Sequence, residues 1–280
     1  MKKIICLVLA VCLTACLFAG CGKNDDKTAS DASEAQKTAE VIKFGTNAEF
    51  PPFEFVAANG VIDEFDGIDI CIAKEIAEQN GATAKIENME FDSLLVALQN
   101  KQIDAVIAGM TATDERKESV NFSTPYYTDY VSVLVEDSSG IKALADLKDK
   151  VVGVSSGSTS ARALVQEMID EGVITGEGFN ADTFNADTWK DGISFRQYDD
   201  YPAISTALSA GEVNGFCVDK SILAIYKTEG RSYIDAEFSP QEYGVATKKG
   251  SGFSSVCDEL VTGWLADGTI DGLIKENGLE

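Results

Sequence analysis

The sequence predicts an α/β protein of two lobes, in which each lobe is a mixed sheet flanked by helices and a two-strand hinge joins the lobes. Strand and helix patterns alternate from Val41 onward, which is typical of helices packed on the faces of a sheet. The body, residues 41–280, is too long for one comfortable hydrophobic core. Segments 97–111 and 207–221 each read as a helix end, a polar turn, a hydrophobic strand and a polar tip, which supports two similar lobes. A chance match of two such units is the alternative.

The spacing of apolar residues locates the individual elements. In the first lobe it predicts strands at 41–46, 83–87 and 104–108 and helices at 70–79 and 92–100. Asp92 is expected to cap the second helix, because its carboxylate can accept hydrogen bonds from the free amides of the first turn. In the second lobe it predicts strands at 151–154 and 215–218 and helices at 160–170 and 220–227. The polar stretch 170–191 is expected to be a surface insertion.

The first 21 residues have the pattern of a lipoprotein signal peptide. Two lysines precede a short apolar run, small residues stand directly before Cys21, and polar residues follow it. Cys21 is therefore expected to be acylated and to anchor the protein outside the cytoplasm, on the cell membrane. Cys16 fits a similar pattern, and an ordinary signal peptide with incidental cysteines is a further alternative. Residues 22–40 contain no large apolar residue and are expected to form a disordered tether.

Composition argues against several functions. The chain has 46 acidic and 23 basic residues, a net charge of −23, which excludes nucleic acid as an expected partner. It has no histidine, and its seven cysteines include no Cys-x-x-Cys pair, so neither a zinc site nor another cofactor is expected. The three cysteines of the body, Cys71, Cys217 and Cys257, are expected to be small buried side chains.

Two short β-prone segments are expected to cross between the lobes, near residues 127–131 and 242–246. One lobe would then comprise 41–128 and 245–280, and the other 129–244. Paired crossing strands form a hinge, which lets two lobes close around a ligand.

The stretch 103–127 places anion-binding groups at the carboxyl end of a strand, where open α/β sheets bind their ligands. The strand ends in Gly109, Met110 and Thr111, and a short helix puts Arg116 close to this tip. A guanidinium can donate two parallel hydrogen bonds to a carboxylate, so Arg116 is the leading candidate to hold one. A surface salt bridge to a neighbouring acid is the alternative role.

Further candidates lie on both sides of the expected crevice. Thr113 is expected to cap the short helix. In the second lobe Gly157, Ser158 and Thr159 open a helix whose free amides favour an anion. Asp219 ends a strand and could accept from an ammonium group, or it could cap the helix that follows.

These motifs, with the Phe-Ser-x-Pro-Tyr-Tyr segment that ends at Tyr127, resemble the polar amino-acid family of extracytoplasmic solute-binding proteins, family 3, which serve ABC importers. The resemblance runs from about Val41 to Glu280 and implies the type 2 periplasmic-binding-protein fold. It implies that Thr111 and Arg116 hold the α-carboxylate of a free amino acid, while Asp219 accepts from its ammonium group. The implied partners are the permease and ATPase subunits of the importer.

The resemblance also assigns residues around the rest of the ligand. Two phenylalanines, Phe50 and Phe91, are expected to sandwich it, and Asn47 stands where some relatives place an aspartate for basic side chains, which makes a basic ligand less expected. Asp69 is carried over only as a structural residue at a helix start. The complete predicted ligand-binding set is Asn47, Phe50, Phe91, Gly109, Met110, Thr111, Arg116, Ser158, Thr159 and Asp219.

Two other functions fit the same resemblance. Cyclohexadienyl dehydratases share the fold, and in this histidine-free chain Glu49 or Glu54 would have to act as the acid or base. A ligand-sensing protein that signals through a separate partner is the second alternative. Binding without catalysis is the favoured prediction.

Overall fold

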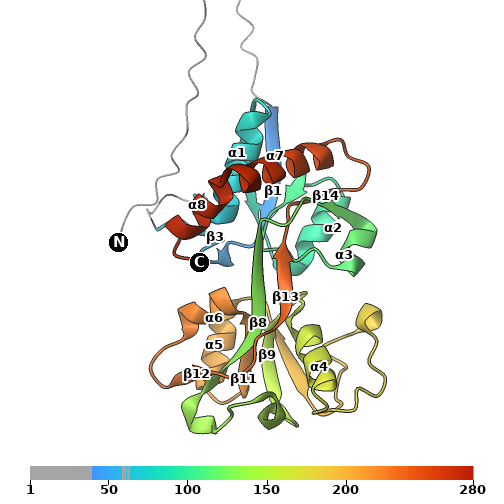
Figure 1. Cartoon of the computed structure of the whole chain (residues 1–280), viewed down its shortest axis with the longest axis vertical. Helices are drawn as coiled ribbons and strands as arrows, with labels where there is room; N and C mark the ends of the chain where they lie inside the picture. Colours follow the sequence, from blue (N-terminus) through green and yellow to red (C-terminus); the bar gives the residue numbers. More distant parts are fainter. Residues whose placement is uncertain (1–39, 59–60, 62–63, 280) are drawn as a thin grey trace, which may run out of the picture.

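The computed structural model describes residues 40–58, 61 and 64–279. The predicted signal peptide, Cys21 and the predicted tether up to residue 39 lie outside these residues. The chain forms two lobes of mixed sheet and helix, as predicted, stacked along the long axis of the molecule (Figure 1). None of the helices in the described part of the chain combines the length and the apolar character needed to cross a bilayer.

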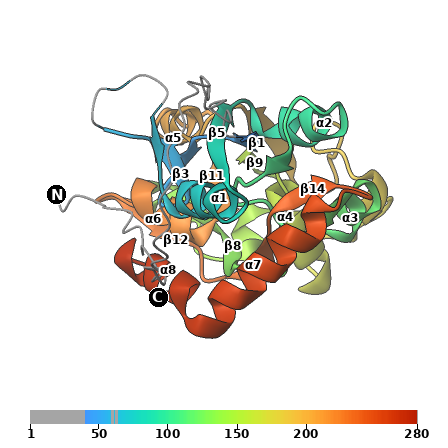
Figure 2. The same ribbon diagram turned by 90° about the horizontal axis from the view of Figure 1, so that it is seen from above.

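The sheet of the first lobe has the order β5-β1-β6-β14-β7. Its strands are β1 (Glu40–Thr46), β5 (Ala82–Asn88), β6 (Ala105–Val106), β7 (Val120–Phe122) and β14 (Ala246–Lys248). β1 runs parallel to β5 and β6, whereas β14 is antiparallel to both of its neighbours. Its helices are α1 (Ile68–Gln79), α2 (Leu94–Gln99), α3 (Asp114–Ser119), α7 (Phe253–Asp267) and α8 (Thr269–Glu276). Seen from above, α7 runs across this lobe past α1 (Figure 2).

The first lobe also contains a small separate sheet, which carries Phe50 and Glu54. It consists of β2 (Glu49–Phe50), β3 (Glu54–Val56) and β4 (Phe65–Asp66), all antiparallel.

The sheet of the second lobe has the order β10-β9-β11-β8-β12, and β13 also pairs with β8. Its strands are β8 (Tyr127–Glu136), β9 (Val151–Ser155), β10 (Ser194–Tyr198), β11 (Gly215–Asp219), β12 (Arg231–Tyr233) and β13 (Phe238–Tyr243). Its helices are α4 (Ser160–Asp170), α5 (Tyr201–Ser209) and α6 (Lys220–Tyr226). β9 and β11 are parallel, so their carboxyl ends meet at one edge of the sheet.

Two antiparallel strands connect the lobes. β8 and β13 run side by side between them (Figure 1), with Tyr127 paired to Tyr243 and Thr128 to Glu242. Both tyrosine rings pack on Phe53 of the first lobe, at centroid distances of 5.1 Å. The strand pair is thus rooted in the first lobe and continues as part of the second sheet. The exact lobe limits given above stay predictions.

Three local expectations need correction. Asp92 does not cap α2: Ser93 occupies the cap position, and the Asp92 carboxylate accepts from the Ser93 hydroxyl instead, because residues 91–93 form a separate 3₁₀ turn. Cys217 and Cys257 are buried as expected, whereas Cys71 is only half-buried.

The insertion 170–191 is also more than a surface loop. Its Phe179, Phe184 and Trp189 rings pack on one another at 5.7–5.8 Å and against the core of the second lobe.

Candidate ligand-binding site

A small cavity lies between the two lobes, where strand tips and helix starts from both sides converge. Its free space is about 20 Å³, which is room for roughly one water molecule. Nine of the ten predicted ligand-binding residues line it, and three residues outside that set do so as well: Asn47, Phe50, Phe91, Gly109, Thr111, Arg116, Ser158, Thr159 and Asp219, with Glu54, Ala108 and Tyr201. Met110 is the exception, because its side chain is buried in the core of the first lobe.

Arg116 lies at this junction of the lobes. Thr113 caps α3 as predicted, since its hydroxyl accepts from the Arg116 amide at 3.2 Å. The guanidinium donates to the Thr111 carbonyl at 2.9 Å and, across the crevice, to the Gly157 carbonyl at 3.1 Å. Burial and the nearby Arg162 lower the pKa of Arg116 to about 10, so the group stays charged at neutral pH. It pairs with carbonyls rather than with a neighbouring acid, so its charge is free to meet an anion.

The Arg116 guanidinium also lies over the ring of Phe91, 5.4 Å from the centroid. The ring face attracts the cation. Phe91 thus orients the guanidinium in addition to lining the cavity.

Asp219 is the acid of the second lobe that faces the cavity. Although it precedes α6, its side chain does not cap that helix. The Ser221 amide donates to Asp129 instead, at 3.2 Å. The Oδ1 atom of Asp219 is buried and makes no short hydrogen bond. Burial, reinforced by the negative charge of Asp129, raises the pKa of Asp219 to about 7, although the Tyr243 hydroxyl lies close enough to the carboxyl to lower its pKa. The Oδ1 atom can accept from an ammonium group, which would favour the ionised form.

The strand tip at Gly109 is shaped by Phe50. Gly109 has φ +52°, and a β-carbon at this position would lie 2.6 Å from the Phe50 ring. Only glycine tolerates both the positive φ and the close approach of the Phe50 ring. The backbone at Gly109 can therefore form part of the cavity wall. Phe50 itself is 5% exposed and packs on Tyr201 of the second lobe at 5.7 Å. Asn47 is held by its Nδ2, which donates to the Met89 carbonyl at 3.1 Å.

Gln241, on the crossing strand β13, hydrogen-bonds to a residue of each lobe. It was not among the site residues predicted from the sequence. Its Nε2 donates to the Ser239 carbonyl at 2.8 Å, which fixes the amide so that Oε1 faces the crevice. The hydroxyls of Thr111 and Thr159 both donate to Oε1 at 2.7 Å. These hydroxyl protons are therefore committed to Gln241, whereas the Ser158 hydroxyl is buried without a partner and remains available to a ligand.

A pair of buried acids, also outside the predicted set, lies beneath the cavity. Asp69 is not merely a helix-start residue: it accepts from the Gly109 amide at 2.8 Å and from the Tyr126 hydroxyl at 2.8 and 2.9 Å. Burial raises the pKa of Asp69 to about 6. Glu54 is fully buried, and its pKa is raised well above the usual range by burial and by the charge of Asp69.

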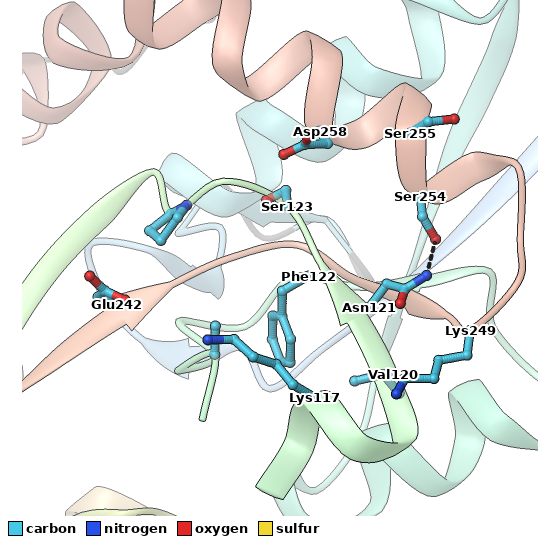
Figure 3. A pocket seen from close by; sticks show the side chains of 12 residues that line it. Lys117, Val120, Asn121, Phe122, Ser123, Glu242, Lys249, Ser254, Ser255 and Asp258 are labelled. Carbon is cyan, nitrogen blue, oxygen red and sulfur yellow. Dashed lines mark hydrogen bonds between the residues drawn. The ribbon is translucent and has the colours of Figure 1, made fainter. Parts of the chain in front are cut away.

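A larger cavity of about 510 Å³ lies elsewhere, on the outer side of the first lobe (Figure 3). It is bounded by α7, β7 and the end of β13, and Asn121 donates to Ser254 across it at 3.1 Å. Its charged residues, Lys117, Glu242, Lys249 and Asp258, do not converge on one point (Figure 3). The smaller cavity is the better site, because complementary charges from two lobes meet there.

Two lobes joined by two crossing strands, with a charged crevice between them, are the architecture expected of a solute-binding protein. Comparisons with known proteins agree. The sequence signature of bacterial extracellular solute-binding proteins, family 3, matches residues 42–177. The arginine-binding extracellular protein ArtP of Bacillus subtilis (strain 168) is 39% identical over 158 residues, which cover 56% of this chain and 57% of that protein. The match therefore spans just over half of that relative's length.

Solved structures match over a greater length. The substrate-binding protein of an amino acid ABC transporter is 30% identical, with a TM-score of 0.69 over 85% of this chain and 99% of that one. An ancestral arginine-binding protein bound to arginine is 31% identical, with a TM-score of 0.71 over 86% of this chain and 99% of that one. An ancestral amino acid-binding protein described as a precursor of cyclohexadienyl dehydratase is 26% identical, with a TM-score of 0.67 over 84% of this chain and 94% of that one.

This chain belongs to family 3 of the bacterial extracellular solute-binding proteins. The predicted fold and the predicted family are thereby confirmed, and with the family comes an extracytoplasmic location.

Proposed function

We propose that the protein binds a polar L-amino acid between its lobes and delivers it to the permease and ATPase subunits of an ABC importer, without catalysis. The observation that carries the proposal is the convergence of Arg116 and Asp219, from opposite lobes, on one cavity. A zwitterion has one charge for each of them, and a buried charge needs such a partner. The functions named for the relatives support the same class of ligand.

A thermal-shift screen of ligand-stripped protein against the common L-amino acids tests this proposal. A ligand at about a hundred times its Kd adds roughly 2.7 kcal/mol to the free energy of unfolding. In a body of this size that corresponds to a rise in Tm of roughly 5–10 °C. If no amino acid raised the Tm, the proposal would be wrong.

We further propose that Cys21 carries a lipid anchor. Cys21→Ser should release the protein from the membrane fraction and abolish incorporation of labelled fatty acid, whereas Cys16→Ser should do neither. The opposite pattern would assign the anchor to Cys16.

A dehydratase function is the second candidate, because Glu54 offers a protonatable carboxyl at the cavity. Incubation with prephenate or arogenate decides between the two. The binding proposal expects no dehydrated product above the uncatalysed rate.

A further inference from the structure

Pairing both charges of an amino acid leaves one buried acid at the cavity unused. Arg116 and Ser158 offer donors to the carboxylate, and Asp219 Oδ1 offers an acceptor to the ammonium group. Glu54 remains. Its side chain is fully buried, lines the cavity and hydrogen-bonds to the carboxylate of Asp69, and no other described residue donates to either of its oxygens.

The surroundings of Glu54 offer it an acid rather than a donor. Asp69 lies against it, and the oxygens of Asp69 already accept from the Gly109 amide and the Tyr126 hydroxyl. Leaving a buried acceptor without a donor costs about 1–3 kcal/mol or more. The raised pKa keeps a proton on Glu54, which donates it to Asp69, so the second oxygen of Glu54 is left to accept from a group inside the cavity.

We infer that Glu54 is a specificity-determining residue, which accepts a hydrogen bond from an N–H group at the end of the ligand's side chain. The inference rests on the proposed function and narrows the ligand class to L-amino acids with a guanidinium, ammonium or amide terminus. Asn47 made a basic ligand less expected. Glu54, on β3, would supply the acid that a basic side chain requires, so a basic ligand becomes an expected one.

A cationic side chain would change the protonation of this acid. The ionisable groups that face Glu54 are Asp69 from α1, Tyr126 from the segment before β8, and Tyr201 from α5. Across the same cavity lie Arg116 and Asp219. A cation placed beside Glu54 stabilises its ionised form, so the proton leaves to solvent when such a ligand binds.

Calorimetry on wild type and Glu54→Gln tests the inference with L-arginine, L-lysine and L-glutamine against L-norvaline, which lacks a terminal donor. Wild type should prefer at least one donor-bearing ligand by roughly tenfold or more, and the variant should lose most of that preference while binding norvaline nearly as before. Glu78→Gln, on the exposed face of α1, should change neither affinity. An unchanged preference in Glu54→Gln would overturn the inference alone. Failure of wild type to bind any amino acid would overturn the proposed function with it.

The number of protons released, measured in buffers of different ionisation enthalpy, gives a second readout. For a cationic ligand the wild type should release about one proton more than Glu54→Gln, and the two should agree for norvaline. If the variant does not fold, the wild type alone decides: the cationic ligand should release about one proton more than norvaline. Equal release would contradict the inference.

Discussion

Two oppositely charged side chains, one from each lobe, face the same cavity. Arg116 reaches it from the first turn of α3, where a cation opposes the helix dipole. Asp219 reaches it from the end of β11 and keeps one buried oxygen that makes no short hydrogen bond. Each group is in a position that becomes favourable once the opposite charge is present.

Arg116→Ala should weaken amino-acid binding by about 2–5 kcal/mol, because the ligand's carboxylate would be left without its partner. That is a loss of roughly thirtyfold or more. Calorimetry would measure it, with circular dichroism to show that the variant is folded. Lys117→Ala, an exposed neighbour on the same helix, is the matched control and should retain affinity. Retained affinity in Arg116→Ala would count against its role as anchor.

The pKa of Asp219, about 7 in the ligand-free protein, predicts a pH-dependent affinity. The ammonium group of a ligand binds the ionised acid, so the Asp219 contribution should raise affinity by about tenfold per pH unit up to roughly pH 7 and then level off. The Kd measured from pH 5 to 8 checks this. A Kd that does not change over this range would mean that Asp219 does not meet the ammonium group.

The same raised pKa affects the ligand-free protein in the opposite direction. A carboxyl with a raised pKa stabilises the folded state below its usual pKa of 3.8, and that stabilisation is lost as pH rises through about 7. The free energy of unfolding of ligand-free protein should therefore fall between about pH 4 and 7. Asp219→Asn should flatten the part of this slope that Asp219 causes, because its amide does not titrate.

At the scale of elements, the loop before α4 brings the second lobe against the first. Gly157 has φ +70°, and a β-carbon there would lie 2.8 Å from the Asp92 β-carbon. Arg162 of α4 also pairs with Glu115 of α3 at 3.5 Å. At this side of the crevice the lobes thus meet through a small residue and charged helix starts, whereas Phe50 and Tyr201 form an aromatic contact between the lobes at the cavity.

Gly157→Ala should force the lobes apart and weaken ligand binding. Gly172→Ala is the matched control, because Gly172 has a similar φ of +69° but open space around its β-carbon position. Both variants should lose about 1 kcal/mol of stability through backbone strain. Only Gly157→Ala should lower the affinity measured by calorimetry; equal affinities would show that this contact does not control closure.

Elements set by local spacing were predicted well from the sequence, and contacts between distant segments were not. The predicted helix 160–170 coincides with α4, and the Thr113 cap is confirmed, since each depends on residues within a few positions. Gln241 could not be found in this way, because its partners Thr111 and Thr159 lie 130 and 82 residues away. Glu54 was named in the sequence only as an alternative catalytic acid or base, and its place at the ligand cavity became visible only in the folded chain.

At the scale of the whole molecule, the crossing strands β8 and β13 join the two lobes, and the candidate site lies between the lobes. The cavity, about 20 Å³, is too small for an amino acid with the lobes this close. Ligand entry therefore requires the lobes to separate about β8 and β13. Gln241 sits on this hinge and hydrogen-bonds to a threonine of each lobe, so separation must break at least one of these bonds.

The most direct test of a zwitterion held between the lobes is calorimetry with the best-binding L-amino acid and two analogues of it. One analogue carries an amide in place of the α-carboxylate, and the other lacks the α-amino group. Each should bind about thirtyfold or more weakly than the parent, because each leaves Arg116 or Asp219 without its partner. Parent-like affinity of either analogue would contradict the pairing of both charges across the crevice.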